Sequence, residues 1–376
     1  KISKWDGKPL KKGDKLLVIS EQGLGDTIHF MRYIPYLKQK GIDILFCAQP
    51  ALHNIIKASG IDSHPLTPEQ ANLVSEGKWI PLLSLPLHLE VTPNNPLVDK
   101  PYIQPTNKLI TKWKNNLSKE QRPIIGINWQ GNPDAEKDNL KNRSFPLETF
   151  STLAKGNNIN FISLQKGFGS EQLEHCSFKE QFVSCQQEID EIWDFLEIAA
   201  IIANCDLIIS SDTSVAHLAA GMGKSTWLLL KDIPEWRWGI EGEKSFWYPS
   251  IRLFRQKERN NWNEVMERIS KEFKRVSLKT TTSIQDSSKA SQALKLLNQG
   301  NFDESEKIYR ELISTGKANH IVYGNLAVIC GKKNNIKEQI SLLNKAIEIE
   351  PNQPILYNNL GNALKQQGDV TKAIQN

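Results

Sequence analysis

Short apolar runs alternate with amphipathic stretches over residues 1–276. The runs that have the length and β-branched content of buried parallel strands lie at residues 15–20, 42–47, 124–129, 161–164, 207–210 and 226–230. A further short strand and loop is expected within residues 80–87. Helices are expected at residues 27–39, 51–58, 109–117, 147–154, 189–204 and 262–273. This alternation predicts an α/β fold with doubly wound parallel sheets.

A polar, proline-rich segment at residues 93–105 interrupts the alternation, and a second α/β series starts at Pro123. We therefore predict two Rossmann-like domains, at residues 1–116 and 117–276. Ligands of such sheets bind in the crevice outside the carboxyl ends of the strands. Pro35 lies inside the first helix, where its missing N–H group predicts a kink or an early end.

Beyond residue 289 the pattern repeats with a period of 34 residues. Equivalent turns are opened by Gly300, Asn334 and Gly368, and an equivalent small-residue position is occupied by Ala293, Ala327 and Gly361. A helix–turn–helix of this period is the tetratricopeptide signature. We predict an all-α segment of about two and a half repeats at residues 290–376, after a Ser/Thr-rich linker at residues 277–289. Since the chain begins with Lys1 and ends inside a repeat, further repeats are expected to follow.

The most informative stretch, residues 205–230, predicts a strand, a tight turn, a helix and a second strand. Residues 211–214 supply turn and N-cap side chains, and His217 follows on the first helical turn. A helix N-terminus at the carboxyl end of a parallel strand binds anions through its N–H groups and its dipole. An ordinary capped helix is the alternative that the pattern leaves open.

Two nucleotide-binding motifs are excluded. Residues 223–226 (GKST) end like a P-loop, but that motif needs a glycine where Leu218 stands and a strand where a helix is expected. Residues 23–25 (GLG) lack the third glycine of the dinucleotide fingerprint, and no acidic residue ends a second strand in the required context. A P-loop NTPase and an NAD-linked oxidoreductase are therefore rejected.

Composition and charge limit the classes of partner that are expected for this protein. The net charge of +5 comes without any long Lys/Arg block, which argues against nucleic acid but suits a phosphorylated ligand. The 5 cysteines lack C-x-x-C or zinc spacing and predict reduced thiols in a cytoplasmic protein. No transmembrane segment is expected, and peripheral attachment to the inner membrane is left open.

Several segments together carry a resemblance to a known family. They are residues 21–27 (EQGLGDT), 129–133 (WQGNP), 143–146 (RSFP), 163–167 (SLQKG), 212–217 (DTSVAH), 247–249 (WYP) and 253–256 (LFRQ). In these segments the chain resembles bacterial tetratricopeptide-repeat glycosyltransferases, which are relatives of the lipopolysaccharide heptosyltransferases and, more distantly, of the O-linked N-acetylglucosamine transferases. The segments span nearly all of residues 1–276.

The resemblance implies the GT-B fold, with an acceptor-side domain followed by a nucleotide-sugar-binding domain. It implies an inverting transfer of a sugar from a nucleotide diphosphate donor to a glycan, lipid-linked or protein acceptor. No metal or other cofactor is expected.

The resemblance also implies individual roles. Asp26 is expected to be the catalytic base, with His29 as the weaker candidate. Donor binding is expected of Arg143, Gln165, Lys166, Asp212, Thr213, Ser214 and His217, and further crevice positions are Gly25, Trp129, Asn132, Trp236 and Arg237. Structural alternatives stay open, namely an N-cap for Asp26, a core histidine for His217, a surface cation for Arg143, a strand-exit turn for Gln165 and Lys166, and packing for the tryptophans.

Two hypotheses of different classes remain. The first is an active glycosyltransferase, and the second is a tetratricopeptide scaffold with a degenerate transferase domain. The presence of Asp26, Arg143, Asp212, Thr213 and His217 favours the enzyme. In either case the repeats are expected to bind a protein, a peptide or a second copy of the chain.

Overall fold

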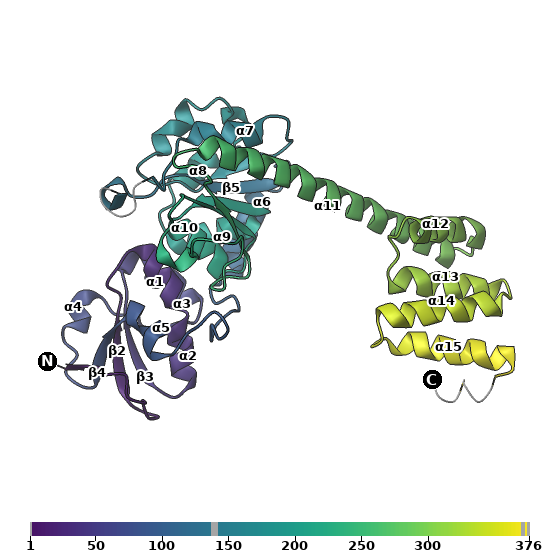
Figure 1. Cartoon of the computed structure of the whole chain (residues 1–376), viewed down its shortest axis with the longest axis horizontal. Coiled ribbons are helices and arrows are strands. Elements are labelled where there is room, and N and C mark those ends of the chain that lie inside the picture. Colours follow the sequence, from purple (N-terminus) through teal and green to yellow (C-terminus); the bar gives the residue numbers. More distant parts are fainter. Residues whose placement is uncertain (1, 137–141, 370–372, 374–376) are drawn as a thin grey trace. The chain divides into compact units, whose positions relative to one another are not determined.

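The computed structural model describes residues 2–136, 142–369 and 373 (Figure 1). It divides the chain into two units, Lys1–Lys271 and Glu272–Asn376. Each unit has a hydrophobic core of its own, so each is described by itself.

The first unit contains two parallel sheets, and each sheet defines a lobe. The N-terminal lobe has the strand order β1-β4-β2-β3, with β1 (Ser3–Lys4), β2 (Lys15–Ile19), β3 (Asp43–Cys47) and β4 (Lys78–Pro81). The C-terminal lobe has the order β6-β5-β7-β8-β9, with β5 (Ile124–Asn128), β6 (Asn160–Ser163), β7 (Leu207–Ser211), β8 (Thr226–Leu230) and β9 (Ile251–Arg255). The predicted α/β class with two Rossmann-like halves is confirmed, and β1 and β9 are strands that we did not predict.

Helices connect the strands in both lobes. In the N-terminal half they are α1 (Leu24–Phe30), α2 (Tyr33–Gln39), η1 (Pro50–Leu52), α3 (His53–Ala58), α4 (Pro68–Ala71), η2 (Leu82–Ser84), α5 (Leu85–His88) and α6 (Asn107–Asn116). After β5 they are η3 (Pro133–Glu136), η4 (Leu147–Phe150), α7 (Ser151–Ala154), η5 (Ser170–Glu174), η6 (Lys179–Gln181), α8 (Gln186–Asp190), α9 (Phe195–Asn204), α10 (Ser214–Gly221) and η7 (Trp236–Trp238).

The helix expected at residues 27–39 is two helices, α1 and α2, separated at Met31 and Arg32. The early end that Pro35 predicted is therefore confirmed. A proline lacks the N–H group for the helical hydrogen bond, and its ring crowds the carbonyl four residues earlier, which here belongs to Met31.

The predicted boundary at residues 116/117 does not match the packing of α6. This helix lies before the boundary but contacts α9 of the C-terminal lobe. The buried Trp113 donates its Nε1–H to Glu197 Oε1 at 3.1 Å, and Lys112 pairs with the same oxygen at 2.6 Å. Because the apolar face of α6 is buried against α9, the second lobe recruits residues from before 117.

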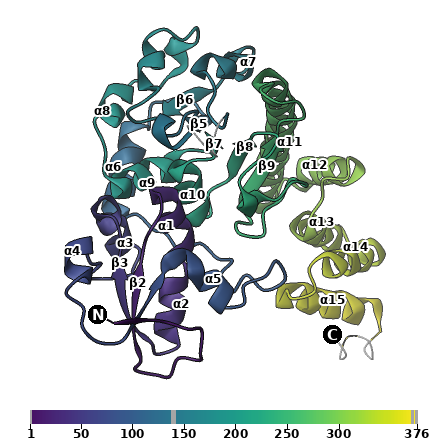
Figure 2. The same cartoon turned by 60° about the vertical axis from the view of Figure 1, so that its left-hand side comes forward.

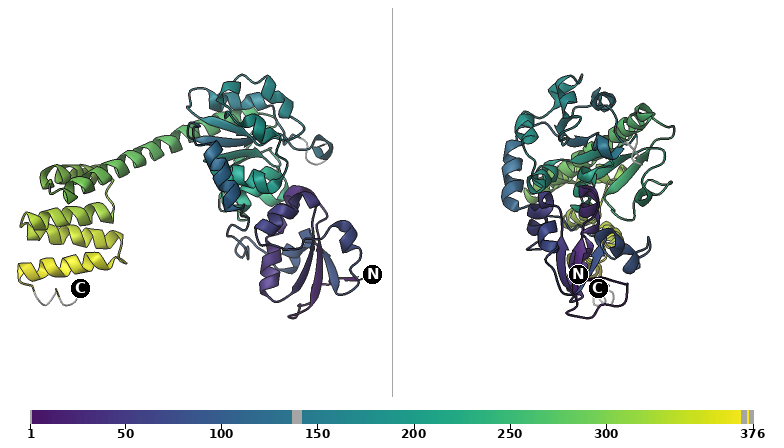
Figure 3. Two further views of the ribbon diagram at one scale, coloured as in Figure 1. Left: turned by 180° about the vertical axis from the view of Figure 1, so that it is seen from behind. Right: turned by 90° about the vertical axis from the view of Figure 1, so that its left-hand side faces the viewer.

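The second unit consists of stacked helices (Figure 3, left). They are the later part of α11 (Trp262–Asn298) followed by α12 (Phe302–Ser314), α13 (His320–Lys332), α14 (Ile336–Ile349) and α15 (Pro354–Gln367). The 34-residue positions Gly300, Asn334 and Gly368 all adopt the left-handed backbone, with φ of 79°, 62° and 93°. This conformation ends a helix and favours glycine or asparagine, which explains the residues chosen there.

The residues predicted as a linker, 277–289, are helical, because α11 runs through them without a break. Serine and threonine are only about 0.5 kcal/mol per residue poorer than alanine in a helix, and no glycine or proline interrupts the stretch. Helical flanks on both sides outweigh that small penalty.

No helix among the described residues is both long and apolar enough to span a membrane.

Candidate functional site

The helix N-terminus expected to bind an anion carries no side-chain cap. α10 begins at Ser214 after the N-cap residue Thr213, whose hydroxyl instead donates to Asn128 Oδ1 at 2.8 Å. Asn128 ends β5, the strand next to β7. The first N–H groups of α10 are therefore left for a ligand at the carboxyl edge of the sheet. Thr213 therefore does not cap α10 with its side chain, and the anion-binding role of this helix start stays a prediction.

The carboxylate of Asp212 is held by the protein. Trp238 donates its Nε1–H to Asp212 Oδ2 at 2.9 Å, and the Asp212 side chain is 14% exposed. Burial raises the pKa of Asp212, while the charges of Arg237 and Arg143 act in the opposite direction. Since a carboxylate repels a diphosphate, we expect any donor binding at Asp212 to use its backbone.

His217 and His29 form a buried aromatic pair between the lobes. Their ring centroids are 5.1 Å apart. His217 Nδ1 lies 3.0 Å from the Tyr248 hydroxyl, and Arg237 Nη1 lies 3.3 Å from His29 Nδ1. Burial holds both imidazole pKa values well below the usual range, and the charges of Arg32 and Arg237 lower them further. Both rings are therefore neutral at pH 7.

This pair predicts that mild acid destabilises the first unit. Between the folded pKa and about pH 6.5, each histidine binds a proton only in the unfolded chain. Stability is therefore complete above pH 6.5 and falls as the pH drops, by up to about 1.4 kcal/mol per pH unit for each histidine. Thermal unfolding followed from about pH 8 to 5 measures the slope. His29→Gln should flatten it and His64→Gln, at an exposed position, should not; an equal slope in both variants contradicts the prediction.

Asp26 is placed by both of its oxygens. Its Oδ2 accepts a hydrogen bond from the Gly23 N–H at 3.2 Å, and its Oδ1 pairs with Arg237 Nη2 at 2.5 Å. The Asp26 side chain remains 22% exposed. The N-cap alternative is wrong, because Gly23 is the N-cap of α1 and Asp26 is the third residue of that helix. Asp26 still stabilises the start of α1 through the Gly23 N–H, while its second oxygen faces the other lobe.

A glycine brings Asp26 close to the helix N-terminus. A Cβ atom on Gly25 would lie 3.1 Å from the His217 ring and 3.4 Å from the Ser214 Cα, so α1 and α10 approach closely only with a residue of this size. Figures 1 and 2 both show α1 beside α10. The carboxyl ends of β2 and β7 therefore meet here, and with them the expected base and the expected anion site.

Arg237 belongs to η7, which crosses the same place. Its Nε pairs with Glu235 Oε2 at 2.6 Å, and its side chain is 8% exposed. The flanking tryptophans differ, because Trp238 is 3% exposed and Trp236 is 63% exposed. Packing is thus the role of Trp238, whereas Trp236 stays open to solvent at a ring distance of 6.5 Å from Phe30.

Arg143 lies on the other side of α10's N-terminus. Its Nη1 donates to the Asp212 carbonyl at 3.1 Å, and its Nε pairs with Glu136 Oε1 at 3.1 Å. The guanidinium rests on Gly131, where a Cβ would lie 2.4 Å from Nη2. With a side chain that is 15% exposed, Arg143 is not the surface cation of the alternative interpretation.

Gln165 and Lys166 use their polar atoms within the protein. The Gln165 amide braces the loop after β5 through Asn128 Nδ2, the N–H groups of Trp129 and Gln130, and the carbonyls of Gln130 and Phe168. Lys166 Nζ donates to the Ile189 carbonyl, and burial lowers its pKa to about 8. Their donor-binding roles stay predictions, and the structure assigns both a structural task.

The two remaining crevice candidates, Trp129 and Asn132, differ in exposure to solvent. Trp129 is fully buried. Asn132 is exposed and accepts the Asp134 N–H at 3.0 Å.

The site also contains residues that sequence reasoning did not select. Asn128 was missed although it ends a buried strand, which is the position where ligand-facing side chains are expected. Tyr248 lies in the WYP segment that carries the resemblance but was given no role there, and its role comes from its contact with His217. Glu235 had no comparable signal, because its role comes from its partner in space, Arg237. We call Asp26, Arg143, Asp212, His217 and Arg237, with the N-terminus of α10, the interlobe site.

No group of three or more His, Cys, Asp or Glu side chains in the part of the chain that the structure describes is arranged to hold a metal ion.

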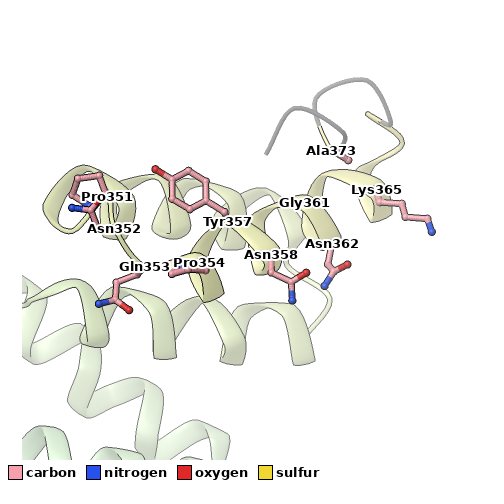
Figure 4. Close-up of a pocket in the computed structure, with 10 residues that line it drawn as sticks. All are labelled: Pro351, Asn352, Gln353, Pro354, Tyr357, Asn358, Gly361, Asn362, Lys365 and Ala373. Carbon is pink, nitrogen blue, oxygen red and sulfur yellow. The ribbon is translucent and has the colours of Figure 1, made fainter.

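The second unit carries an open groove of about 830 Å³ (Figure 4). It is lined by Pro351, Asn352, Gln353, Pro354, Tyr357, Asn358, Gly361, Asn362, Lys365 and Ala373. Amide side chains from successive turns of α15 give it a polar wall.

Comparison with known proteins assigns the C-terminal part. Models of the tetratricopeptide repeat match residues 321–353 and 342–375. This part of the chain is therefore a tetratricopeptide-repeat segment, as the period predicted.

A curated relative covers more of the chain. Protein FlbA of Caulobacter vibrioides is 23% identical over 292 residues, which are 71% of this chain and 47% of that protein. The chain thus spans about half the length of this relative.

Solved structures of glycosyltransferases resemble the chain at low identity. The glycosyl transferase family 9 protein of Veillonella parvula is 12% identical and covers 67% of this chain and 88% of its own, with a TM-score of 0.45. The ADP-heptose LPS heptosyltransferase II of E. coli is 13% identical and covers 71% and 99%, with a TM-score of 0.45.

Proposed function

We propose that the chain is a glycosyltransferase that moves a sugar from a nucleotide diphosphate donor to a glycan, lipid-linked or protein acceptor. The observation that carries the proposal is the meeting of the Asp26 carboxylate with an uncapped helix N-terminus and two guanidinium groups. A carboxylate beside an anion site is the pairing that transfer from a phosphorylated donor requires.

The positive side of the interlobe site suits a diphosphate. The N–H groups of α10 and the dipole of the helix favour an anion, and a guanidinium binds phosphate oxygens in a bidentate manner. Arg143 and Arg237 supply fixed positive charge for the leaving group. We therefore propose that transfer proceeds without a metal ion.

The negative side suits a general base. Asp26 would take the proton of the acceptor hydroxyl while that oxygen forms its bond to the anomeric carbon. The bond from the anomeric carbon to the diphosphate breaks at the same time, and its electron pair leaves with the nucleoside diphosphate. Attack from the face opposite the leaving group inverts the anomeric configuration.

A screen of nucleotide sugars tests this function. UDP-, ADP-, GDP- and dTDP-linked sugars are added singly, and the thermal unfolding of the first unit is followed. Sugars linked to one of these four nucleotides should raise the unfolding temperature, because a ligand that binds only the folded state stabilises that state. The scaffold with a degenerate transferase domain, which is the competing hypothesis, is supported if no nucleotide sugar has an effect.

For the second unit we propose binding of a protein or peptide, with the α15 groove as the polar surface. The residues that we propose for the diphosphate all lie in the first unit, so the repeats are not needed for the donor. A cytoplasmic location fits the donor and the 5 cysteines, none of which forms a disulfide.

Removing residues 280–376 is expected to change donor affinity by no more than a few-fold, because the interlobe site lies entirely within Lys1–Lys271. Isothermal titration of the donor selected by the screen measures the effect. Circular dichroism of the shortened chain is the control for folding. A collapse of donor binding in a folded sample contradicts the division of labour between the units.

A further inference from the structure

One guanidinium group occupies the oxygen that the proposed reaction needs. Arg237 Nη2 lies 2.5 Å from Asp26 Oδ1, while Asp26 Oδ2 is engaged by the Gly23 N–H. Since Oδ2 is engaged by the Gly23 N–H, Arg237 competes with an acceptor hydroxyl for Oδ1. The ion pair also joins residues 211 positions apart in the sequence and from different lobes.

The surroundings of Arg237 hold its backbone but leave its side chain a choice of partners. Its carbonyl accepts the Trp247 Nε1–H at 3.1 Å, and the neighbouring Trp238 is anchored on Asp212. Glu235 binds Nε at 2.6 Å. A guanidinium has five N–H donors, so the edge that faces Asp26 can exchange one anion for another while Nε stays on Glu235.

The alternative partner is the diphosphate itself. Arg237 lies near the start of α10. Its neighbour Trp238 donates to Asp212 Oδ2 at 2.9 Å, and its own partner Asp26 follows Gly25, where a Cβ would lie 3.4 Å from the Ser214 Cα. Breaking a largely buried ion pair is costly when nothing replaces the lost partner. A diphosphate on α10 provides that replacement, because a phosphate, like a carboxylate, offers a guanidinium two oxygens for bidentate hydrogen bonds.

We propose that Arg237 is a donor-sensing latch on the base: without donor it covers Asp26 Oδ1, and the donor diphosphate draws its guanidinium to the α10 N-terminus and uncovers that oxygen. The inference rests on the proposed function and adds an order of events, in which donor binding precedes the uncovering of Asp26 Oδ1. Asp26 stays in place after the exchange, because the Gly23 N–H still holds Oδ2. Arg237 is thus a positioning residue for the base and a ligand of the donor in turn.

The test is diphosphate binding to four proteins, namely wild type, Asp26→Asn, Arg237→Ala and the double variant. Isothermal titration with inorganic pyrophosphate and with ADP, UDP, GDP and dTDP avoids any dependence on turnover. Arg237→Ala should weaken binding about ten- to hundred-fold, since a charge-assisted hydrogen bond is lost. Asp26→Asn should tighten binding about three- to ten-fold, because the competing carboxylate charge is gone.

The double variant separates the latch from simple charge repulsion. If Asp26 acted only by repelling the anion, Asp26→Asn would tighten binding equally in the Arg237→Ala background. The latch requires that Asp26→Asn brings no gain in affinity in the Arg237→Ala background, because that background has no guanidinium to release. A matched ion pair at the opposite edge of the sheet, Arg122 with Asp206 at 2.9 Å, provides the controls Arg122→Ala and Asp206→Asn, which should leave binding unchanged.

Outcomes for the latch and for the proposed function are distinguishable. Wild-type chain that binds none of the five ligands overturns the proposed function and the latch together. Binding by the wild type with no gain in Asp26→Asn, or with the same gain in both backgrounds, overturns the latch alone.

Discussion

Replacing Asp26 with asparagine is expected to lower sugar transfer about 10²- to 10⁴-fold, which is the usual contribution of a general base. The asparagine carbonyl can still accept the Gly23 N–H bond at the start of α1, whose N-cap is Gly23 itself. Folding should therefore be unchanged, and diphosphate binding should be retained or tightened. Initial rates and donor titrations on the same sample separate these effects.

A second aspartate, which caps a helix and also accepts a hydrogen bond from Asn54 Nδ2 at 3.1 Å, provides the matched control. Asp194 is the N-cap of α9, where its Oδ1 accepts the Leu196 N–H at 3.0 Å. Asp194→Asn should leave turnover unchanged. Near-normal turnover in Asp26→Asn would reduce Asp26 to the same structural role and would leave His29 or a group of the acceptor as the base.

Arg143→Ala is expected to weaken donor binding about five- to hundred-fold, through loss of a charge-assisted hydrogen bond. Its guanidinium is fixed by the Asp212 carbonyl and Glu136, beside the N-terminus of α10. Because this is the proposed diphosphate position, nucleoside diphosphate binding should suffer more than nucleoside monophosphate binding. Titration with both ligands measures the ratio.

Removing Arg143 also leaves the Glu136 carboxylate, 14% exposed, without its cation. Arg143→Ala is therefore compared with Arg143→Ala/Glu136→Gln, which removes the stranded charge. The control is Arg122→Ala. Arg122 pairs with Asp206 and lies just before β5, at the end of that strand opposite to the interlobe site. Equal losses for mono- and diphosphate, or none, would place the diphosphate elsewhere.

The lobe to which α6 belongs and the continuity of α11 could not be predicted from the local sequence pattern, because neighbouring segments decide both. α6 belongs with α9 through the burial of Trp113, which no local pattern reveals. α11 continues through a Ser/Thr-rich stretch, because small propensity penalties lose to helical neighbours on both sides. In both cases the deciding energy comes from contacts that lie outside the segment.

The candidate site divides in the same way. The turn between β7 and α10 was recognisable as an anion site, because residue types, strand and helix lie within one short stretch. Gln165 was expected to face the donor, yet its amide is used by the loop after β5. A motif identifies a residue, but the hydrogen-bond partners of that residue depend on segments elsewhere in the chain.

The sequence by itself determined what short-range patterns encode, namely the buried strands, the 34-residue repeat with its left-handed turns at Gly300, Asn334 and Gly368, and the helix N-terminus of α10. Only the tertiary structure decided that Asp26 meets Arg237. The two residues belong to different lobes and are 211 positions apart in the sequence. The reason is physical: periodicity and turn propensity act over a few residues, whereas an ion pair across two sheets exists only once both sheets have packed and Gly25 has let α1 approach α10.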